Sequence, residues 1–185
     1  MDTREKLIVE GIREMERYGL KSFSVRRVAA ACGVSCAAPY RHFQDKHAYV
    51  MAMIGYINEQ WYARKSIAAA RREGDLRGQI VEISMEYVRF LTENPQFRSI
   101  IMLRDDSMTA EEKRLQREIS KGTNEIIDAY CKSVHMPPDV RARKTFVVRS
   151  LIYGSALMLD SGALEDSPDT HEIIRACIER EFILD

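Results

Sequence analysis

Apolar residues recur along the chain three and four positions apart, the spacing that places them on one face of an α-helix, and strand-like alternation is nearly absent. Glycine, proline and capping residues interrupt this pattern and mark the ends of the predicted helices. Gly122 is expected to break the helix predicted over residues 111–134. The pattern predicts an all-α fold of nine helices, one ending at Gly19 and the others over residues 25–32, 35–42, 45–70, 77–92, 95–103, 111–134, 139–160 and 167–182.

The segment from Phe23 to Lys46 contains two short predicted helices joined by a tight turn. Ser24 is suited to cap the first helix and Ser35 the second, and Gly33 permits the positive φ that the turn requires. Two helices joined in this way are typical of a helix-turn-helix, whose second helix enters the major groove of DNA. The alternative is an ordinary three-helix bundle without affinity for DNA, because Ala-Gly-Val turns are common.

Charge supports the helix-turn-helix interpretation only locally. The whole chain has 28 basic and 28 acidic residues, so its net charge indicates no particular partner. The stretch from Lys21 to His47, by contrast, contains five basic residues and one acidic residue. Such a stretch in a neutral chain favours contact with phosphates, although solvated surface is the more common role of charge runs.

Composition and spacing argue against several other classes of protein. Hydrophobic residues make up 45% of the chain and charged residues 30%, as in ordinary globular proteins. The first residues are charged, and no apolar run approaches the length of a membrane span, so we expect a cytoplasmic protein with reduced cysteines and no membrane partner. The histidines and cysteines lack zinc-site spacing, and no nucleophile or paired acid is placed by the sequence. We therefore expect no metal, no cofactor and no enzymatic activity.

The N-terminal region resembles a known family, the TetR/AcrR family of bacterial regulators, over about residues 4–54. The run from Ala38 to Lys46 resembles the most diagnostic part of that family, usually Tyr-x-His-Phe-x-x-Lys. Gly11 and Pro39 depart from the pattern, in which alanine and an aliphatic residue are usual, and Pro39 is expected to make the start of its helix irregular. The residues that carry the resemblance are Arg4, Ile8, Gly19, Phe23, Ser24, Val25, Val28, Ala29, Gly33, Val34, Ser35, Tyr40, His42, Phe43 and Lys46.

The resemblance implies a TetR-like fold with a helix-turn-helix DNA-binding domain at residues 1–47 and a ligand-binding and dimerisation domain at residues 48–185. In that arrangement Tyr40, His42 and Lys46 would hold phosphates. Arg26 and Arg41 would reach base edges, helped by the shape of the DNA. The full set of implied DNA contacts is Ser24, Arg26, Ser35, Cys36, Ala37, Ala38, Tyr40, Arg41, His42 and Lys46.

Members of this family sense small molecules in the second domain, which implies a pocket between its helices. Aromatic and Met residues of the middle helices are the candidates for its lining, although each of them alone is more simply a core residue. A lining of this kind favours an apolar or flat ligand. The candidates are Trp61, Tyr62, Met85, Tyr87, Phe90, Phe97, Met102 and Tyr153.

The last two predicted helices are apolar around too much of their circumference for burial on one side. Pairing with the same helices of a second copy would make a four-helix interface with two-fold symmetry. The alternative is that the helix over residues 139–160 is wholly internal. The predicted interface residues are Phe146, Leu151, Ile152, Leu157, Ile174, Cys177 and Ile178.

Together these features lead to the hypothesis of a homodimeric repressor that binds a palindromic operator in double-stranded DNA. A small apolar or aromatic effector would release it by binding better to a state that cannot hold DNA. The alternative is a DNA-binding regulator switched by oxidation of Cys36, which stands at a groove-facing position. Cys32 is four residues away, but Gly33 lies between them, so the two thiols need not share a face. An all-helical enzyme has no support in the sequence.

Overall fold

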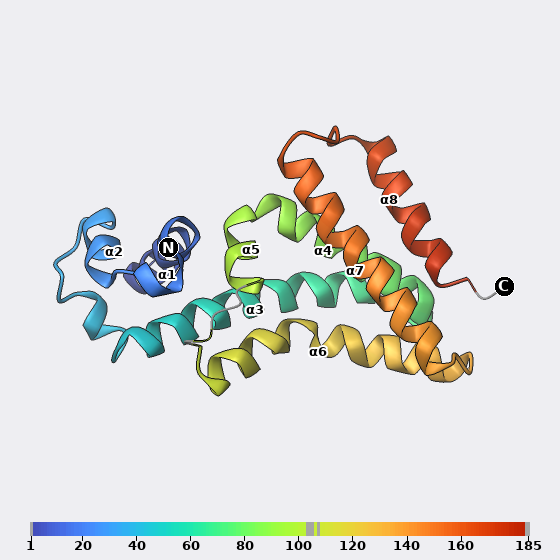
Figure 1. Ribbon diagram of the computed structural model, residues 1–185, viewed down its shortest axis with the longest axis horizontal. Coiled ribbons are helices and arrows are strands. Elements are labelled where there is room, and N and C mark those ends of the chain that lie inside the picture. The colour runs from blue at the N-terminus through green and yellow to red at the C-terminus, as the bar shows by residue number, and fades with distance from the viewer. Residues whose placement is uncertain (1, 103–105, 107, 184–185) are drawn as a thin grey trace. The chain divides into compact units, whose positions relative to one another are not determined.

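The computed structural model describes residues 2–102, 106 and 108–183. None of these residues lies in a strand, and no described helix is both long and apolar enough to cross a membrane. The predicted all-α class is therefore confirmed (Figure 1). The described helices are α1 (Thr3–Ser22), α2 (Val25–Ala31), the 3₁₀ helix η1 (Pro39–Arg41), α3 (Lys46–Ala70), α4 (Leu76–Glu93), α5 (Pro95–Ile101), α6 (Ala110–Ser133), α7 (Pro138–Asp160) and α8 (Pro168–Glu181).

Capping side chains set most of the helix starts. The oxygens of Ser24, Asp75 and Ser167 accept hydrogen bonds from backbone N–H groups three residues further on, at 3.4, 2.9 and 3.3 Å. These bonds satisfy donors that a helix N-terminus otherwise leaves free. The predicted starts of α2, α4 and α8 therefore agree with the structure to within a residue.

The structure differs from the prediction at two described places. The predicted helix over residues 35–42 is replaced by η1, so the described residues hold eight α-helices where nine helices were expected. Gly122 does not break its helix, because α6 runs without interruption across it. The expected end of the short helix at residue 103 lies outside the described residues.

The chain divides into two compact units, Met1–Gln60 with Pro95–Ile119, and Trp61–Asn94 with Ser120–Asp185. The helices α3 and α6 each contribute residues to both units. The domain boundary predicted at residue 47 follows the expected DNA-binding role of the N-terminal helices, whereas these two units are defined by compact packing. The boundary at residue 47 stays a prediction.

The core of the first unit gathers around Tyr49, in the first turn of α3 and fully buried. Its hydroxyl donates a hydrogen bond of 2.5 Å to the carbonyl oxygen of Leu7 in α1. Its ring stacks on Phe43 with centroids 4.1 Å apart and meets the edge of Phe23 at 5.4 Å. Burial raises the pKa of Tyr49, so the hydroxyl stays a hydrogen-bond donor. One side chain thus joins α1, the segment after η1 and α3.

The core of the second unit is formed by α4, α7 and α8 together with parts of α3 and α6. Trp61 and Phe90 are at most 2% exposed, and their ring centroids lie 5.4 Å apart. The buried hydroxyl of Tyr130 in α6 donates a hydrogen bond of 2.6 Å to the carbonyl oxygen of Phe182. This bond fastens the residue that follows α8 to α6.

Lys65, on α3 in the second unit, is an unusual buried cation, with 9% of its surface exposed. Its ammonium lies 4.5 Å from the ring centroid of Tyr62, and burial lowers its pKa against the opposing charge of Glu125. A Cβ added to Gly122 in α6 would collide with this ammonium. The glycine therefore makes room for Lys65, and this explains a residue that costs a helix interior about 1 kcal/mol relative to alanine.

Gly11 in α1 packs closely against two side chains of α3. A Cβ at this position would lie 2.9 Å from the Met53 sulfur and 3.2 Å from the Tyr49 hydroxyl oxygen, both on α3. We expect Gly11→Ala to lower the free energy of unfolding by about 1–2 kcal/mol, because overpacking outweighs the gain in helix propensity. Urea unfolding followed by circular dichroism measures it.

Gly55 in α3 is the matched control, since a Cβ there meets no described atom within 4 Å. Gly55→Ala should raise the free energy of unfolding by about 0.5–1 kcal/mol. Equal stabilisation by both substitutions would contradict the proposed close packing at Gly11.

Candidate nucleic-acid interface

The first helix of the helix-turn-helix and the turn that follows it match the sequence prediction. Val28 and Ala29 of α2 are buried, with at most 1% of their surface exposed. Gly33 has a φ of 68°, in the left-handed region that favours glycine. The N–H of Val34 then donates to the carbonyl oxygen of Ala29 at 3.0 Å, which closes the turn against α2.

A proline sets the conformation of the recognition segment, Ser35–His42. Pro39 has no N–H, so it cannot form the α-helical bond to the Ser35 carbonyl. Instead, Ala38 donates to the Ser35 oxygen at 2.9 Å and Arg41 to the Ala38 oxygen at 3.1 Å, the pattern of a 3₁₀ helix. The prediction of an α-helix here is wrong for this reason: the irregularity expected at its start extends through the segment.

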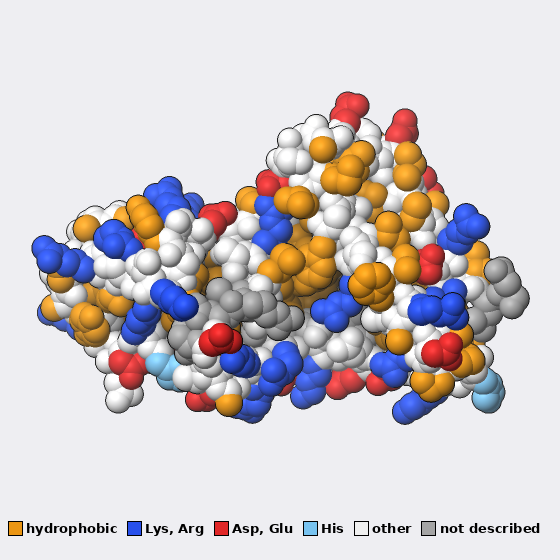
Figure 2. Space-filling view, viewed as in Figure 1, with side chains coloured by type: hydrophobic (Ala, Val, Ile, Leu, Met, Phe, Trp, Pro, Cys, Tyr) orange, Lys and Arg blue, Asp and Glu red, His pale blue; other side chains and the backbone are white. Residues whose placement is uncertain are grey.

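Most of the predicted DNA-contacting residues are exposed. Pro39 is buried and anchors the recognition segment, whereas Tyr40 is 58% exposed. Figure 2 shows Lys and Arg side chains at the surface around α1 and α2. The exposed members of the predicted set are Arg26, Ser35, Cys36, Ala37, Tyr40, Arg41, His42 and Lys46, and the half-buried members are Ser24 and Ala38.

Arg27 has a structural role that its place in a basic stretch does not reveal. Its Nε donates a hydrogen bond of 2.7 Å to Glu14, and another guanidinium nitrogen donates to the Ser22 carbonyl oxygen at 2.5 Å. The bond to Glu14 raises the pKa of Arg27. Arg27 thereby ties α2 to α1, whereas the adjacent Arg26 is exposed and its contact with DNA stays a prediction. The signal in the sequence is Glu14 itself, a carboxylate on the apolar face of its helix.

Lys46, a predicted phosphate contact, is also held within the domain. Its ammonium donates a hydrogen bond of 2.9 Å to the carbonyl oxygen of Leu20 and lies 5.8 Å from the ring centroid of Phe23. An ammonium has three donors, so this bond leaves others for a phosphate oxygen. The structure therefore gives Lys46 a fixed position near the end of α1, and its contact with DNA stays a prediction.

His47 joins the start of α3 to the start of α6. Glu112 and Thr109 form a capping box at α6, with the Thr109 N–H donating to Glu112 at 2.8 Å and the Glu112 N–H donating to Thr109 at 3.1 Å. The Nδ1 of His47 lies 2.9 Å from the other Glu112 oxygen, and its Nε2 lies 3.7 Å from Glu111. The hydrogen bond with Glu112 raises the pKa of His47.

The cysteines and histidines form no recognisable metal centre. Among residues 2–102, 106 and 108–183, no three His, Cys, Asp or Glu side chains are grouped so that they could hold a metal ion. Cys36 is exposed, whereas Cys32 is half-buried with its sulfur 3.7 Å from the Lys6 carbonyl oxygen. Burial raises the pKa of Cys32.

The predicted pocket residues fall into both compact units. Phe97 and the exposed Met102 belong to the first unit, and the other six belong to the second. There Trp61 and Tyr87 have ring centroids 4.5 Å apart, and Tyr153 stands 6.1 Å from Tyr87. We call Trp61, Tyr87, Phe90 and Tyr153 the aromatic cluster. These rings, with Met85 1% exposed and Tyr62 half-buried, pack as core residues, and their role as a ligand site stays a prediction.

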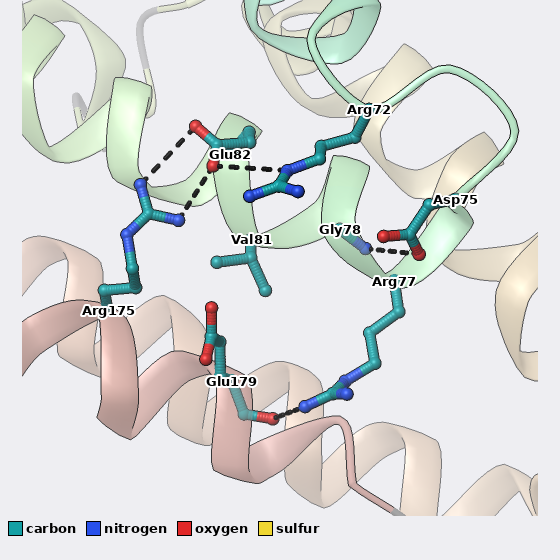
Figure 3. Close-up of a pocket in the computed structure, with 8 residues that line it drawn as sticks. All are labelled: Arg72, Asp75, Arg77, Gly78, Val81, Glu82, Arg175 and Glu179. Atoms are coloured by element: carbon teal, nitrogen blue, oxygen red, sulfur yellow. Dashed lines mark hydrogen bonds and ion pairs between the residues drawn. The ribbon is translucent and has the colours of Figure 1, made fainter.

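The second unit also contains a polar cavity of about 180 Å³ that the sequence pattern did not predict (Figure 3). Its charged side chains come from the turn before α4, the first turns of α4 and one face of α8. The only local signal is the alternation of basic and acidic residues over 71–82, because pairing with α8 is set by the tertiary fold. The lining residues are Arg72, Asp75, Arg77, Gly78, Val81, Glu82, Arg175 and Glu179.

The predicted dimer residues lie on two sides of α7 and α8. Ile152, Ile174 and Ile178 are buried within the second unit, and Leu151 is half-buried. Phe146 and Leu157 are 72% and 59% exposed, and Cys177 is also exposed. Figure 2 shows hydrophobic side chains at the surface over both helices. We call the exposed apolar residues Phe146, Val147, Leu157, Met158 and Ile173 the α7–α8 face.

Comparison with known proteins supports the helix-turn-helix assignment. Residues 7–53 match the family model described as bacterial regulatory proteins, tetR family. Comparison with curated protein sequences gave no match.

Solved structures share the fold of nearly the whole chain. A TetR family transcription regulator from Marinobacter aquaeolei VT8 is 22% identical, with 96% of this chain and 94% of that chain covered and a TM-score of 0.79. The TetR family regulator PfmR from Thermus thermophilus is 18% identical, with 98% of this chain and 96% of that chain covered and a TM-score of 0.71. AibR, solved with isovaleryl coenzyme A and operator DNA, is 16% identical, with 96% of each chain covered and a TM-score of 0.72.

The exposed recognition segment, which follows α2 and the Gly33 turn, together with the family match defines a helix-turn-helix DNA-binding transcriptional regulator. The family model of tetR bacterial regulators matches the DNA-binding region, and the helices share the fold of solved TetR family regulators. The comparisons do not support the alternative of a switch by oxidation of Cys36.

The link between His47 and Glu112 should make stability depend on pH. A raised histidine pKa means that the added stability is fully present below the unfolded value of about 6.5 and is lost as pH rises through the folded value. We expect His47→Gln to lower the melting temperature more at about pH 6 than at about pH 8.5. Differential scanning calorimetry across this range measures the difference.

Glu112→Gln is the control, because it removes the carboxylate that His47 meets at 2.9 Å. In that background the pH dependence of the His47→Gln effect should be largely lost. A constant effect of His47→Gln across the range would show that the imidazole and the carboxylate are not coupled.

Proposed function

We propose that the protein is a homodimeric repressor that binds a palindromic operator and leaves it when a small apolar or aromatic effector binds. The observation that carries this proposal is the recognition segment, held by the Gly33 turn and the buried Pro39 with Tyr40, Arg41 and His42 exposed. Side chains held in one place by a rigid scaffold lose little freedom when they meet DNA.

The exposed side chains divide into two kinds of DNA contact. Tyr40, His42 and Lys46 can donate hydrogen bonds to phosphate oxygens, which positions the domain without reading sequence. Arg41 and Arg26 are the long donors that can reach base edges in the major groove. Ala37 can offer only a methyl contact, so part of the specificity would come from the shape and deformability of the DNA.

The α7–α8 face supports the dimer. Phe146, Leu157 and Ile173 are each more than half exposed, and exposed large apolar residues of this kind favour association. Pairing of this face with its copy would be two-fold symmetric. Two recognition segments about one DNA turn, roughly 34 Å, apart would then read the two halves of a palindrome.

The aromatic cluster supports the class of effector. Its ring pairs are tilted, edge to face or, for Tyr87 and Phe90, nearly parallel, at centroid distances between 4.5 and 6.2 Å. Such a cluster can open around a flat or branched apolar group. AibR, which shares this fold, was solved with both isovaleryl coenzyme A and operator DNA. By analogy, an effector bound in the second unit would act on DNA binding through a change in the balance of two states.

Selection from a random DNA pool, followed by mobility-shift titration, tests the DNA-binding proposal. We expect a palindromic site to be enriched, and Arg41→Ala to weaken binding to it about ten- to a hundredfold, because one base contact is lost. Binding to unrelated DNA should fall much less.

Arg17→Ala, at an exposed position of α1 outside the predicted contact set, serves as the control and should leave the specific affinity nearly unchanged. Failure to enrich any palindrome at low salt would overturn the proposed function. Equal loss on specific and unrelated DNA would remove Arg41 as a base-reading residue. Apolar and aromatic compounds added to the shifted complex should free the DNA if the effector class is right, and release by none of them would refute that class.

The proposed dimer predicts the effect of placing a charge on the α7–α8 face. Phe146→Asp and Leu157→Asp should convert the dimer to a monomer, since each buries an unpaired carboxylate in an apolar interface. Sedimentation velocity measures the mass. Ile67→Asp is the control, because Ile67 is 61% exposed on α3 and lies outside this face. A wild-type protein that sediments as a monomer at all concentrations would contradict the dimer.

A further inference from the structure

The polar cavity in the second unit brings three guanidinium groups and three carboxylates together (Figure 3). Arg72 and Asp75 come from the turn before α4, Arg77 and Glu82 from the first turns of α4, and Arg175 and Glu179 from adjacent turns of α8. The charges balance in number. What the cavity can bind therefore depends on which of them are already paired.

Two of the three carboxylates are occupied by partners within the protein. Glu82 is 7% exposed and accepts hydrogen bonds from Arg175 at 2.8 and 3.5 Å. Burial alone would raise the pKa of Glu82, but the bond and charge of Arg175 hold it below its usual value. Asp75 accepts the Gly78 N–H at 2.9 Å as the cap of α4. Neither carboxylate needs a ligand.

The remaining groups have unused bonding capacity. Arg77 donates to the backbone carbonyl of Glu179 at 3.1 Å and not to its carboxylate, and the Nε of Arg77 is buried without a hydrogen-bond partner. Within the described residues, the Glu179 carboxylate has no hydrogen bond or ion pair, and Arg72 has only a distant ion pair, 3.8 Å from Glu82. A buried donor without a partner is unfavourable, so a ligand that supplied an oxygen would be favoured.

We propose that this cavity binds a small zwitterion, a molecule with one carboxylate and one ammonium group, such as an α-amino acid. The carboxylate would face Arg72 and Arg77, and the ammonium would face Glu179. A simple anion would be repelled by the unpaired Glu179, and a simple cation by the two arginines. Only a ligand with both charges satisfies both sets of groups.

The size of the cavity agrees with this class of ligand. Its volume of about 180 Å³ is several times the roughly 30 Å³ that a water molecule occupies in the liquid. It is well below the 300–1,000 Å³ of typical pockets for larger ligands. The cavity shares no residue with the aromatic cluster, so the proposal does not rest on the effector site or on DNA binding.

Calorimetric titration of the full chain without DNA tests the proposal, with the twenty L-amino acids first in pools and then singly. Propionate and ethylamine, each of which carries one of the two charges, are the comparison probes. We expect at least one amino acid to bind at least about tenfold more tightly than either probe, because each probe leaves one set of charges unpaired. No binding by any amino acid at about 10 mM, or equal binding by propionate or ethylamine, would overturn the proposal.

Two variants test the negative and the positive group of the cavity separately. Glu179→Gln should weaken amino acid binding about ten- to a hundredfold and leave propionate binding unchanged or stronger, whereas Arg77→Gln should weaken both. Arg71→Gln and Glu181→Gln, next to the cavity in sequence but not in its lining, should change neither.

Glu179→Gln keeps the backbone carbonyl that Arg77 uses, so it remains decisive even if Arg77→Gln is found by circular dichroism to unfold. Unchanged amino acid affinity in Glu179→Gln would overturn the assignment. Such a result would leave the proposed DNA-binding function untouched, because the recognition segment is in the other unit.

Discussion

The hydrogen bond from Tyr49 to the carbonyl oxygen of Leu7 is the contact on which the DNA-binding unit depends. It lies in a buried site where an unpaired hydroxyl or carbonyl would be costly, so it holds α3 at one distance from α1. The ring of Tyr49 also stacks on Phe43, just after the recognition segment. A single aromatic side chain, that of Tyr49, therefore fixes the position of the recognition segment.

Two further residues of this unit, Lys46 and Arg27, also make polar links to α1. Lys46 bonds the Leu20 carbonyl, and Arg27 bonds Glu14 and the Ser22 carbonyl. They approach α1 from two directions, from the start of α3 and from α2. The first helix carries none of the predicted DNA contacts, and its role is to be the platform that orders the elements that do.

Local chemistry explains why much of the fold was predictable from the sequence. A capping serine or a glycine turn acts on residues close by, so the roles of Ser24 and Gly33 follow from their immediate neighbours in the chain. The sequence predicts that Pro39 makes its helix irregular. It does not show how many residues are affected, because that depends on whether α-helical hydrogen bonding resumes after the proline. The exposed residues of the recognition segment followed from the motif, because the turn fixes which side is outward.

Contacts between distant residues account for what the sequence could not show. The partner of Glu14 is a residue on another helix, and the pairing of Glu82 with Arg175 joins α4 to α8. Neither pair has a spacing that a sequence pattern could reveal. The polar cavity belongs to this group, since its walls meet only after the second unit has folded.

Lys65 and Gly122 show how such a distant contact restricts change in the sequence. The ammonium of Lys65 fills the space that a side chain at position 122 would take, although the two residues are on different helices. A mutation at one position therefore alters which mutations the other can accept. Relatives that carry a side chain at 122 must have a shorter residue at 65 or turn its charge out to solvent. The two positions should then vary together in evolution, as a pair selected for its combined volume.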